Sequence, residues 1–146
     1  MSCRTNYIIT ILINNLIYIY MKYKSICNCL YVDQSKIVVS KKKLYTSHVG
    51  TCSVLLFSYN NLNFMAHIDA LQNNSVEINT IIKQHFNPKY IDNVSIYKGN
   101  WCYNDCLSTN IIIASLNKLN ISYKVYEKKI KWNNFIYINN NIVSIN

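Results

Sequence analysis

The sequence is poor in residues that free or bend the backbone, with only 2 Gly and 1 Pro among 146 residues. A nucleotide-phosphate loop needs several glycines close together, because Cβ atoms would keep the backbone away from the phosphates. The scarcity of glycine therefore excludes the P-loop and Rossmann classes of nucleotide-binding protein. It also excludes a collagen-like or linker composition.

Acidic residues and arginine are scarce as well. Asp and Glu total 6 against 15 basic residues, which gives a net charge of +9, and Arg4 is the single arginine. A clustered positive charge would favour binding to the phosphates of nucleic acids. However, the chain nearly lacks arginine, whose planar guanidinium binds phosphates and base edges through paired hydrogen bonds. Lysine shares A/T-rich codons with the abundant Asn, Ile and Tyr, so a coding bias explains the charge. We expect no specific nucleic-acid partner.

The 6 cysteines are unevenly spread. They form a C-x-C pair, a C-x3-C pair and two isolated residues: Cys27 with Cys29, Cys102 with Cys106, and Cys3 and Cys52. These spacings match no familiar disulfide module. A zinc site built from the two pairs is an alternative, although structural zinc sites usually carry turn-forming glycines. We favour reduced, buried thiols in an intracellular, cytoplasmic protein that needs no metal and no other cofactor.

The first 29 residues form a hydrophobic extension with an apolar run over residues 7–20. This run is short for a membrane span, and no small-residue cleavage site follows it. It can be a helix packed on the domain, a membrane-associating appendage, which we favour less, or a piece upstream of a start at Met21. Residues 30–146 have the length and the apolar content of one domain.

Short β-rich runs separated by polar turns dominate residues 30–146, so we expect layers of α and β structure. Two hairpins are predicted, one from 30–32 with 36–40 and one from 53–58 with 64–68, and Lys41 to Lys43 are expected in a solvated turn. The remaining strands are predicted at 94–98, 121–129, 135–138 and 142–145, and helices at 77–85, capped by Ser75, and 108–119.

The second hairpin brings a cysteine and a histidine together. If the turn centres between Asn60 and Asn61, residue 54 opposes residue 67, so Cys52 and His67 lie within cross-strand or diagonal reach. Taken singly, each residue is more often part of a core. Together they supply a nucleophile and a general base, and Gly50 places the thiol at a bend where backbone N–H groups can receive an oxyanion.

The stretch LYTSHVGTCSV at 44–54, followed by Met65, Ala66 and His67, resembles the chemotaxis-type receptor glutamine deamidases. In that family a threonine precedes the nucleophilic cysteine by six residues and an M-A-H phrase supplies the histidine, so Thr46, Cys52 and His67 occupy the matching places. The run from His67 to Asp69 is also similar to the protein N-terminal asparagine amidohydrolases. Both families have a glycine-containing strand end before a helix, where this chain has only Gly99.

The resemblance implies an α+β fold of packed, sandwich-like β-sheets flanked by two or three helices. It also implies a thiol hydrolase that deamidates Asn or Gln in a protein or peptide through a thioester. Thr46 would orient His67 or contact the substrate amide. Asp69 would tune the imidazole or be an ordinary surface carboxylate, and His48 and His85 are alternative bases. A thiol peptidase, a transglutaminase and an inactive basic binding module remain alternatives, and the oligomeric state is open.

Overall fold

The computed structural model describes residues 28–70 and 75–146, so the predicted extension lies outside it except for residues 28 and 29. The described residues form a single domain of nine strands and two α-helices. In chain order these are β1 (Cys29–Tyr31), β2 (Ile37–Ser40), β3 (Lys43–Thr46), β4 (Ser53–Tyr59), β5 (Leu62–Ile68), α2 (Ser75–His85), β6 (Val94–Gly99), α3 (Leu107–Lys118), β7 (Tyr123–Ile130), β8 (Ile136–Asn139) and β9 (Ile142–Ile145). A 3-10 turn, η1 (Pro88–Tyr90), follows α2.

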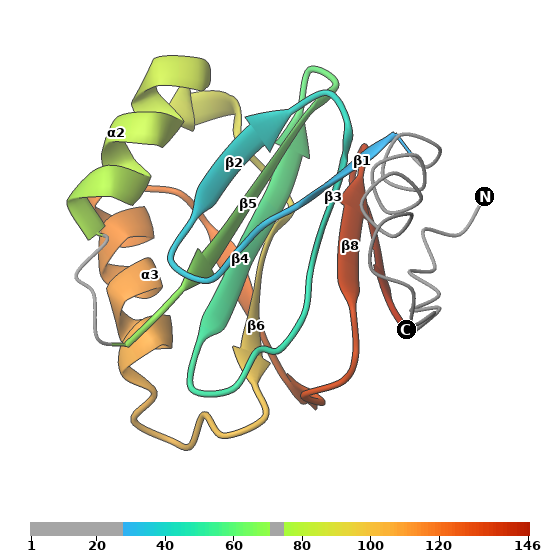
Figure 1. Cartoon of the computed structure of the whole chain (residues 1–146). Coiled ribbons are helices and arrows are strands. Elements are labelled where there is room, and N and C mark those ends of the chain that lie inside the picture. The colour runs from blue at the N-terminus through green and yellow to red at the C-terminus, as the bar shows by residue number, and fades with distance from the viewer. Residues whose placement is uncertain (1–27, 71–74) are drawn as a thin grey trace.

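The strands form two sheets, and the helices cover one of them (Figure 1). A five-stranded sheet has the order β2-β5-β4-β6-β7, and a four-stranded sheet has the order β1-β3-β8-β9. Helices α2 and α3 pack on one face of the larger sheet, and the smaller sheet packs on its other face. The prediction of an α+β fold with packed sheets is confirmed, with both helices on the same outer side.

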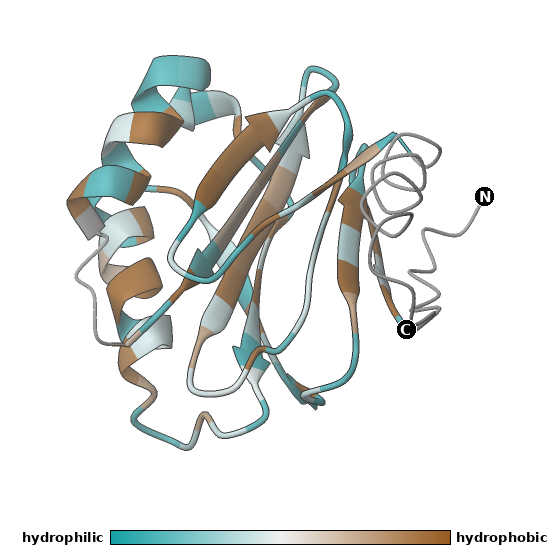
Figure 2. Cartoon of the chain, in the orientation of Figure 1, coloured by the Kyte–Doolittle hydropathy of each residue, from teal (hydrophilic) through white to brown (hydrophobic). Residues whose placement is uncertain are grey.

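Strands β4 and β5 lie at the centre and are buried on both faces. Leu55 and Phe57 face the helices in a core shared with Ile82 of α2 and Leu116 of α3. Val54, which alternates with them along β4, belongs to a second core between the sheets. Because successive strand residues point to opposite faces, one hairpin supplies both cores. Hydrophobic residues accordingly dominate the strands, while the turns and much of α2 are hydrophilic (Figure 2).

The first predicted hairpin is wrong. A turn does form at residues 33–36, where Lys36 N donates to Asp33 O over 3.1 Å, but its flanking strands enter different sheets. Strand β1 pairs parallel with β3, whereas β2 pairs antiparallel with β5. Each strand finds its partner far along the chain, and the local alternation of apolar residues carries no information about which sheet a strand joins.

The other predicted elements are confirmed with small shifts of boundary. Helix α3 begins one residue earlier and β7 two residues later than expected, and Lys43 belongs to β3 instead of a turn. No helix among the described residues is long and apolar enough to cross a membrane.

Asparagine takes the backbone conformations that glycine usually takes. Nine described residues other than glycine have positive φ, and seven of them are asparagine: Asn28, Asn60, Asn61, Asn93, Asn120, Asn140 and Asn141. Asn tolerates the left-handed region because its short polar side chain bonds to the local backbone. The pairs at 60–61 and 140–141 close the β4–β5 and β8–β9 hairpins. A chain with two glycines thus still forms tight hairpins.

Replacing Asn61, whose φ is 61°, with Ala should lower the free energy of unfolding by about 1 kcal/mol, because Ala has a Cβ but no side-chain bond to support the left-handed backbone. Asn61→Gly should be neutral or stabilising. Urea denaturation measures both, with Asn139→Ala on the exposed end of β8 as the matched control. Equal losses from Asn61→Ala and Asn139→Ala would contradict this account of the turn.

Candidate active site

The β4–β5 ladder places Cys52 and His67 on the same face of the larger sheet. Val54 pairs with His67, as the sequence predicted. Cys52 lies two residues before Val54, and both belong to the core between the sheets. His67 therefore sits diagonally across the ladder from Cys52. Both side chains are buried, with 3% and 2% of their surface exposed.

Thr46 reaches His67 from the opposite sheet. Its Oγ1 lies 2.8 Å from His67 Nδ1 and donates its own proton to Val32 O over 2.6 Å. A hydroxyl has one proton, so Thr46 must accept from Nδ1–H of His67. This fixes the imidazole in the tautomer with an unprotonated Nε2. Of the three predicted site residues, Thr46 and His67 are joined by this hydrogen bond, and Cys52 lies on the same sheet face, two residues before the partner of His67.

The unprotonated nitrogen of His67 has no partner. Nε2 is buried and makes no hydrogen bond within the part of the chain that the structure describes, so Cys52 Sγ does not hydrogen bond to it here. A buried, unpaired ring nitrogen normally costs free energy, which makes it a candidate functional group. The arrangement provides a base lone pair in the same interior as the thiol, and no hydrogen bond joins the two groups.

Both groups are neutral at physiological pH. Burial, followed by the nearby Asp69 carboxylate, raises the pKa of the Cys52 thiol to about 11. Burial lowers the pKa of His67 to about 4, although Asp69 and Asp33 oppose this effect. A preformed thiolate–imidazolium pair is therefore disfavoured. The thiol can ionise only as His67 takes its proton, which is general-base catalysis.

Hydrogen bonds to its backbone carbonyl groups fix the loop at residues 49–52, directly before β4. Four consecutive carbonyls accept hydrogen bonds from residues 99–108: Val49 O from Asn100 N at 2.9 Å, Gly50 O from Trp101 N at 3.1 Å, Thr51 O from Ser108 Oγ at 2.9 Å and Cys52 O from Gly99 N at 3.0 Å. In contrast, no hydrogen bond among the described residues uses the N–H of Thr51 or Cys52. These two N–H groups are candidate donors to an oxyanion.

The two glycines permit this close packing, and neither has positive φ. A Cβ on Gly99 would overlap Gly50 O and lie 2.6 Å from Val49 O and 2.7 Å from Cys52 O. A Cβ on Gly50 would lie 2.7 Å from the ring of Trp101 and 3.0 Å from that of Trp132. Residue 99 must therefore be glycine, because the neighbouring carbonyl groups of residues 49, 50 and 52 are backbone atoms that cannot move aside.

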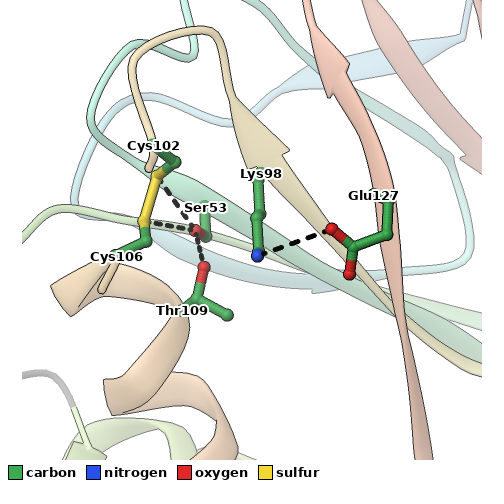
Figure 3. Close-up of polar contacts among 6 residues, drawn as sticks. All are labelled: Ser53, Lys98, Cys102, Cys106, Thr109 and Glu127. Atoms are coloured by element: carbon green, nitrogen blue, oxygen red, sulfur yellow. Dashed lines mark hydrogen bonds and ion pairs between the residues drawn. A yellow bond between two sulfur atoms is a disulfide. The ribbon is translucent and has the colours of Figure 1, made fainter. Parts of the chain in front are cut away.

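A polar cluster supports the same loop from the helix side of the sheet (Figure 3). Ser53 Oγ lies 2.8 Å from Thr109 Oγ1, and the sulfurs of Cys102 and Cys106 are joined in a disulfide beside it. Cys102 Sγ lies 3.3 Å from the carbonyl oxygen of Cys52.

The expectation of reduced thiols is wrong for Cys102 and Cys106, because the loop into α3 brings their Cα atoms to within 5.1 Å of each other. Cys52 is a free thiol.

The same disulfide leaves neither Cys102 nor Cys106 as a thiolate for the alternative zinc site. No group of three or more metal-ligating side chains occurs within residues 28–70 and 75–146.

The other candidate histidines are not placed at the thiol. His48 is exposed, its Nδ1 lies 2.9 Å from Ser47 Oγ, and its ring meets Trp132 edge-on. His85 ends α2, on the other side of the larger sheet. Sequence reasoning missed Ser108, whose hydroxyl bonds to Thr51 O, because a serine inside a predicted helix carries no sign of a distant partner.

Two hollows occur on the described part of the chain. A hollow of about 210 Å³ is lined by Thr51, Trp101 and Leu107 among others, and one of about 510 Å³ lies between β6, β7 and the β8–β9 hairpin. Neither is lined by Cys52 or His67. The Cys52 side chain is 3% exposed.

Comparison with known proteins adds no family. No family model matches the chain, and no curated protein matches it. The likeness to deamidases therefore rests on the motif residues alone and stays a prediction.

The thiol pKa of about 11 sets the pH dependence of Cys52 alkylation. The thiolate fraction, and hence the rate with iodoacetamide, should rise about tenfold per pH unit between pH 6 and 9, because the group remains far below its pKa. Peptide mapping by mass spectrometry follows Cys52 separately from the other cysteines. A rate that levels off near neutral pH would show a thiolate stabilised by His67 and contradict the neutral pair.

Gly99→Ala should displace the loop that carries Cys52, because the new Cβ meets three backbone carbonyls. We expect a loss of about 2 kcal/mol or more in the free energy of unfolding. The matched control is Gly50→Ala, whose Cβ meets indole rings that can rotate, so its loss should be smaller. Thermal and urea denaturation measure both, and an equal or larger loss from Gly50→Ala would contradict the role given to Gly99.

Proposed function

We propose that this chain is a cysteine-dependent amidohydrolase that converts the side-chain carboxamide of an Asn or Gln residue in a protein or peptide to a carboxylate, with release of ammonia. The observation that carries the proposal is His67 Nε2, which is unprotonated, buried and unpartnered within the described residues, on the sheet face that also carries Cys52. A satisfied core histidine would use both ring nitrogens.

The first step forms a thioester. Nε2 of His67 takes the proton of the Cys52 thiol as the sulfur attacks the amide carbon, and the N–H groups of Thr51 and Cys52 stabilise the resulting oxyanion. His67 then passes this proton to the amide nitrogen, the C–N bond breaks and ammonia leaves. The acyl group remains on sulfur, and His67 is again neutral, as its pKa of about 4 favours.

Hydrolysis of the thioester completes the cycle. His67 takes a proton from water, the hydroxide oxygen attacks the carbonyl carbon, and the C–S bond breaks. The proton returns to sulfur, so the thiol is restored and the product is a carboxylic acid that ionises in water. Thr46 keeps Nδ1–H oriented through both steps, as the third member of a triad does.

The test is ammonia release from acetylated peptides that contain either Asn or Gln, with amide-to-acid conversion followed by mass spectrometry. Wild-type protein should release ammonia and, after acid quenching, carry an acyl group on Cys52. Cys52→Ala should fold and release none. Absence of release by the wild type, or equal release by Cys52→Ala, would overturn the proposal. Peptide cleavage would indicate a thiol peptidase instead, and cross-linking to an added amine a transglutaminase.

The orienting role of Thr46 has its own signature. Thr46→Val removes the acceptor for His67 Nδ1–H at similar volume, so kcat should fall about 100-fold with little change in KM. Thr46→Ser keeps the hydroxyl and should retain activity within a few-fold. Equal kcat values for Thr46→Val and Thr46→Ser would show that the hydroxyl does not position the base.

A further inference from the structure

Asp69 stands next to the proposed nucleophile by register. The β4–β5 ladder ends with Ser53 paired to Ile68, and Cys52 and Asp69 are the residues directly beyond this last pair. Asp69 is 8% exposed, and its negative charge raises the pKa of both Cys52 and His67. The carboxylate therefore belongs to the same interior as the thiol and the imidazole.

The turn at residues 33–36 holds both the carboxylate and the base. Gln34 Nε2 donates to Asp69 Oδ2. In the same turn Ser35 N donates to His67 O over 2.8 Å, and His67 N donates to Lys36 O over 3.0 Å. The turn thus fixes an acceptor-only group at a set distance from the base.

A carboxylate beside the thiol does not help that thiol to ionise. Burial is the larger cause of the raised pKa of Cys52, and the negative charge of Asp69 raises it further because like charges disfavour the thiolate. An effect of its charge on the thiol therefore does not explain why a carboxylate lies at this position. A carboxamide, however, has two ends: its oxygen needs donors, which the N–H groups of Thr51 and Cys52 provide, and its NH₂ group needs an acceptor. In the described part of the site, Asp69 is the carboxylate nearest to Cys52 in register.

We propose that Asp69 makes the site select the carboxamide over the carboxylic acid, by accepting a hydrogen bond from the substrate NH₂ group and repelling the carboxylate of the product. This inference rests on the proposed function and gives that site its chemical specificity. The same repulsion helps the product leave, because an ionised product would place a second negative charge beside Asp69.

The experiment measures binding without turnover. On the Cys52→Ala background, calorimetric titration compares an acetylated Gln peptide with its Glu counterpart, and an Asn peptide with its Asp counterpart. The amide should bind at least tenfold more tightly than the acid. Adding Asp69→Asn should weaken amide binding, strengthen acid binding and reduce or reverse this ratio, because Asn keeps the volume, can still accept from Gln34 and can donate to a carboxylate.

Asp33→Asn is the matched control, because it removes the same charge from the turn near His67 but lies outside the ladder. It should leave the amide-to-acid ratio within about twofold of the parent value. Urea denaturation of each variant checks the fold. A ratio unchanged by Asp69→Asn, or changed equally by Asp33→Asn, would overturn the inference.

The two proposals fail separately. If the wild type releases ammonia but Asp69→Asn leaves the amide-to-acid affinity ratio unaltered, the role of Asp69 is wrong and the hydrolase proposal stands. If Asp69→Asn alters the amide-to-acid affinity ratio but the wild type releases no ammonia, the site selects carboxamides and the hydrolase proposal is wrong. In the active enzyme, inhibition by the Glu or Asp peptide should be at least tenfold stronger in Asp69→Asn than in the wild type.

Discussion

The antiparallel pairing of β4 with β5 is the constraint on which the rest of the structure depends. These two strands are buried on both faces, so the helices and the smaller sheet both pack against them. Their register sets Val54 opposite His67 and leaves Cys52 and Asp69 at the open end of the ladder. A shift of one residue would move every side chain to the other face and send His67 to the helices. Core and site are thus specified by the same hydrogen bonds.

The scarcity of glycine shapes the chain in two ways. Hairpin turns use asparagine at positive φ, and the two glycines occur where a Cβ would not fit. Gly99 lets the end of β6 approach the carbonyls of residues 49–52, and its N–H bonds to Cys52 O. Close backbone contact, not conformational freedom, is therefore what glycine contributes here. This contact turns the loop carbonyls toward residues 99–108.

Burial gives the site its character. It keeps Cys52 as a thiol and His67 as a neutral imidazole, and the hydrogen bond from His67 Nδ1–H to Thr46 Oγ1 leaves Nε2 as the only basic nitrogen of the ring. In this respect the two neutral groups resemble the neutral serine hydroxyl and imidazole of serine hydrolases more than a preformed thiolate–imidazolium ion pair. The cost of this arrangement is a buried nitrogen without a partner among the described residues, and the cysteine side chain is almost fully buried as well.

The sequence by itself determined the β4–β5 hairpin, its register and the placement of Cys52 and His67 on one face of the sheet, because hairpin contacts are local and a two-residue turn fixes them. It also indicated the layered α+β class. Only the tertiary structure decided that β1 and β2 separate into different sheets, that Thr46 orients His67 across the sandwich, and that Cys102 bonds to Cys106. The tautomer of His67 and the support of Thr51 by Ser108 were also decided there. These features join residues far apart in the chain, and their geometry follows from how the layers pack, which local patterns of hydrophobicity do not encode.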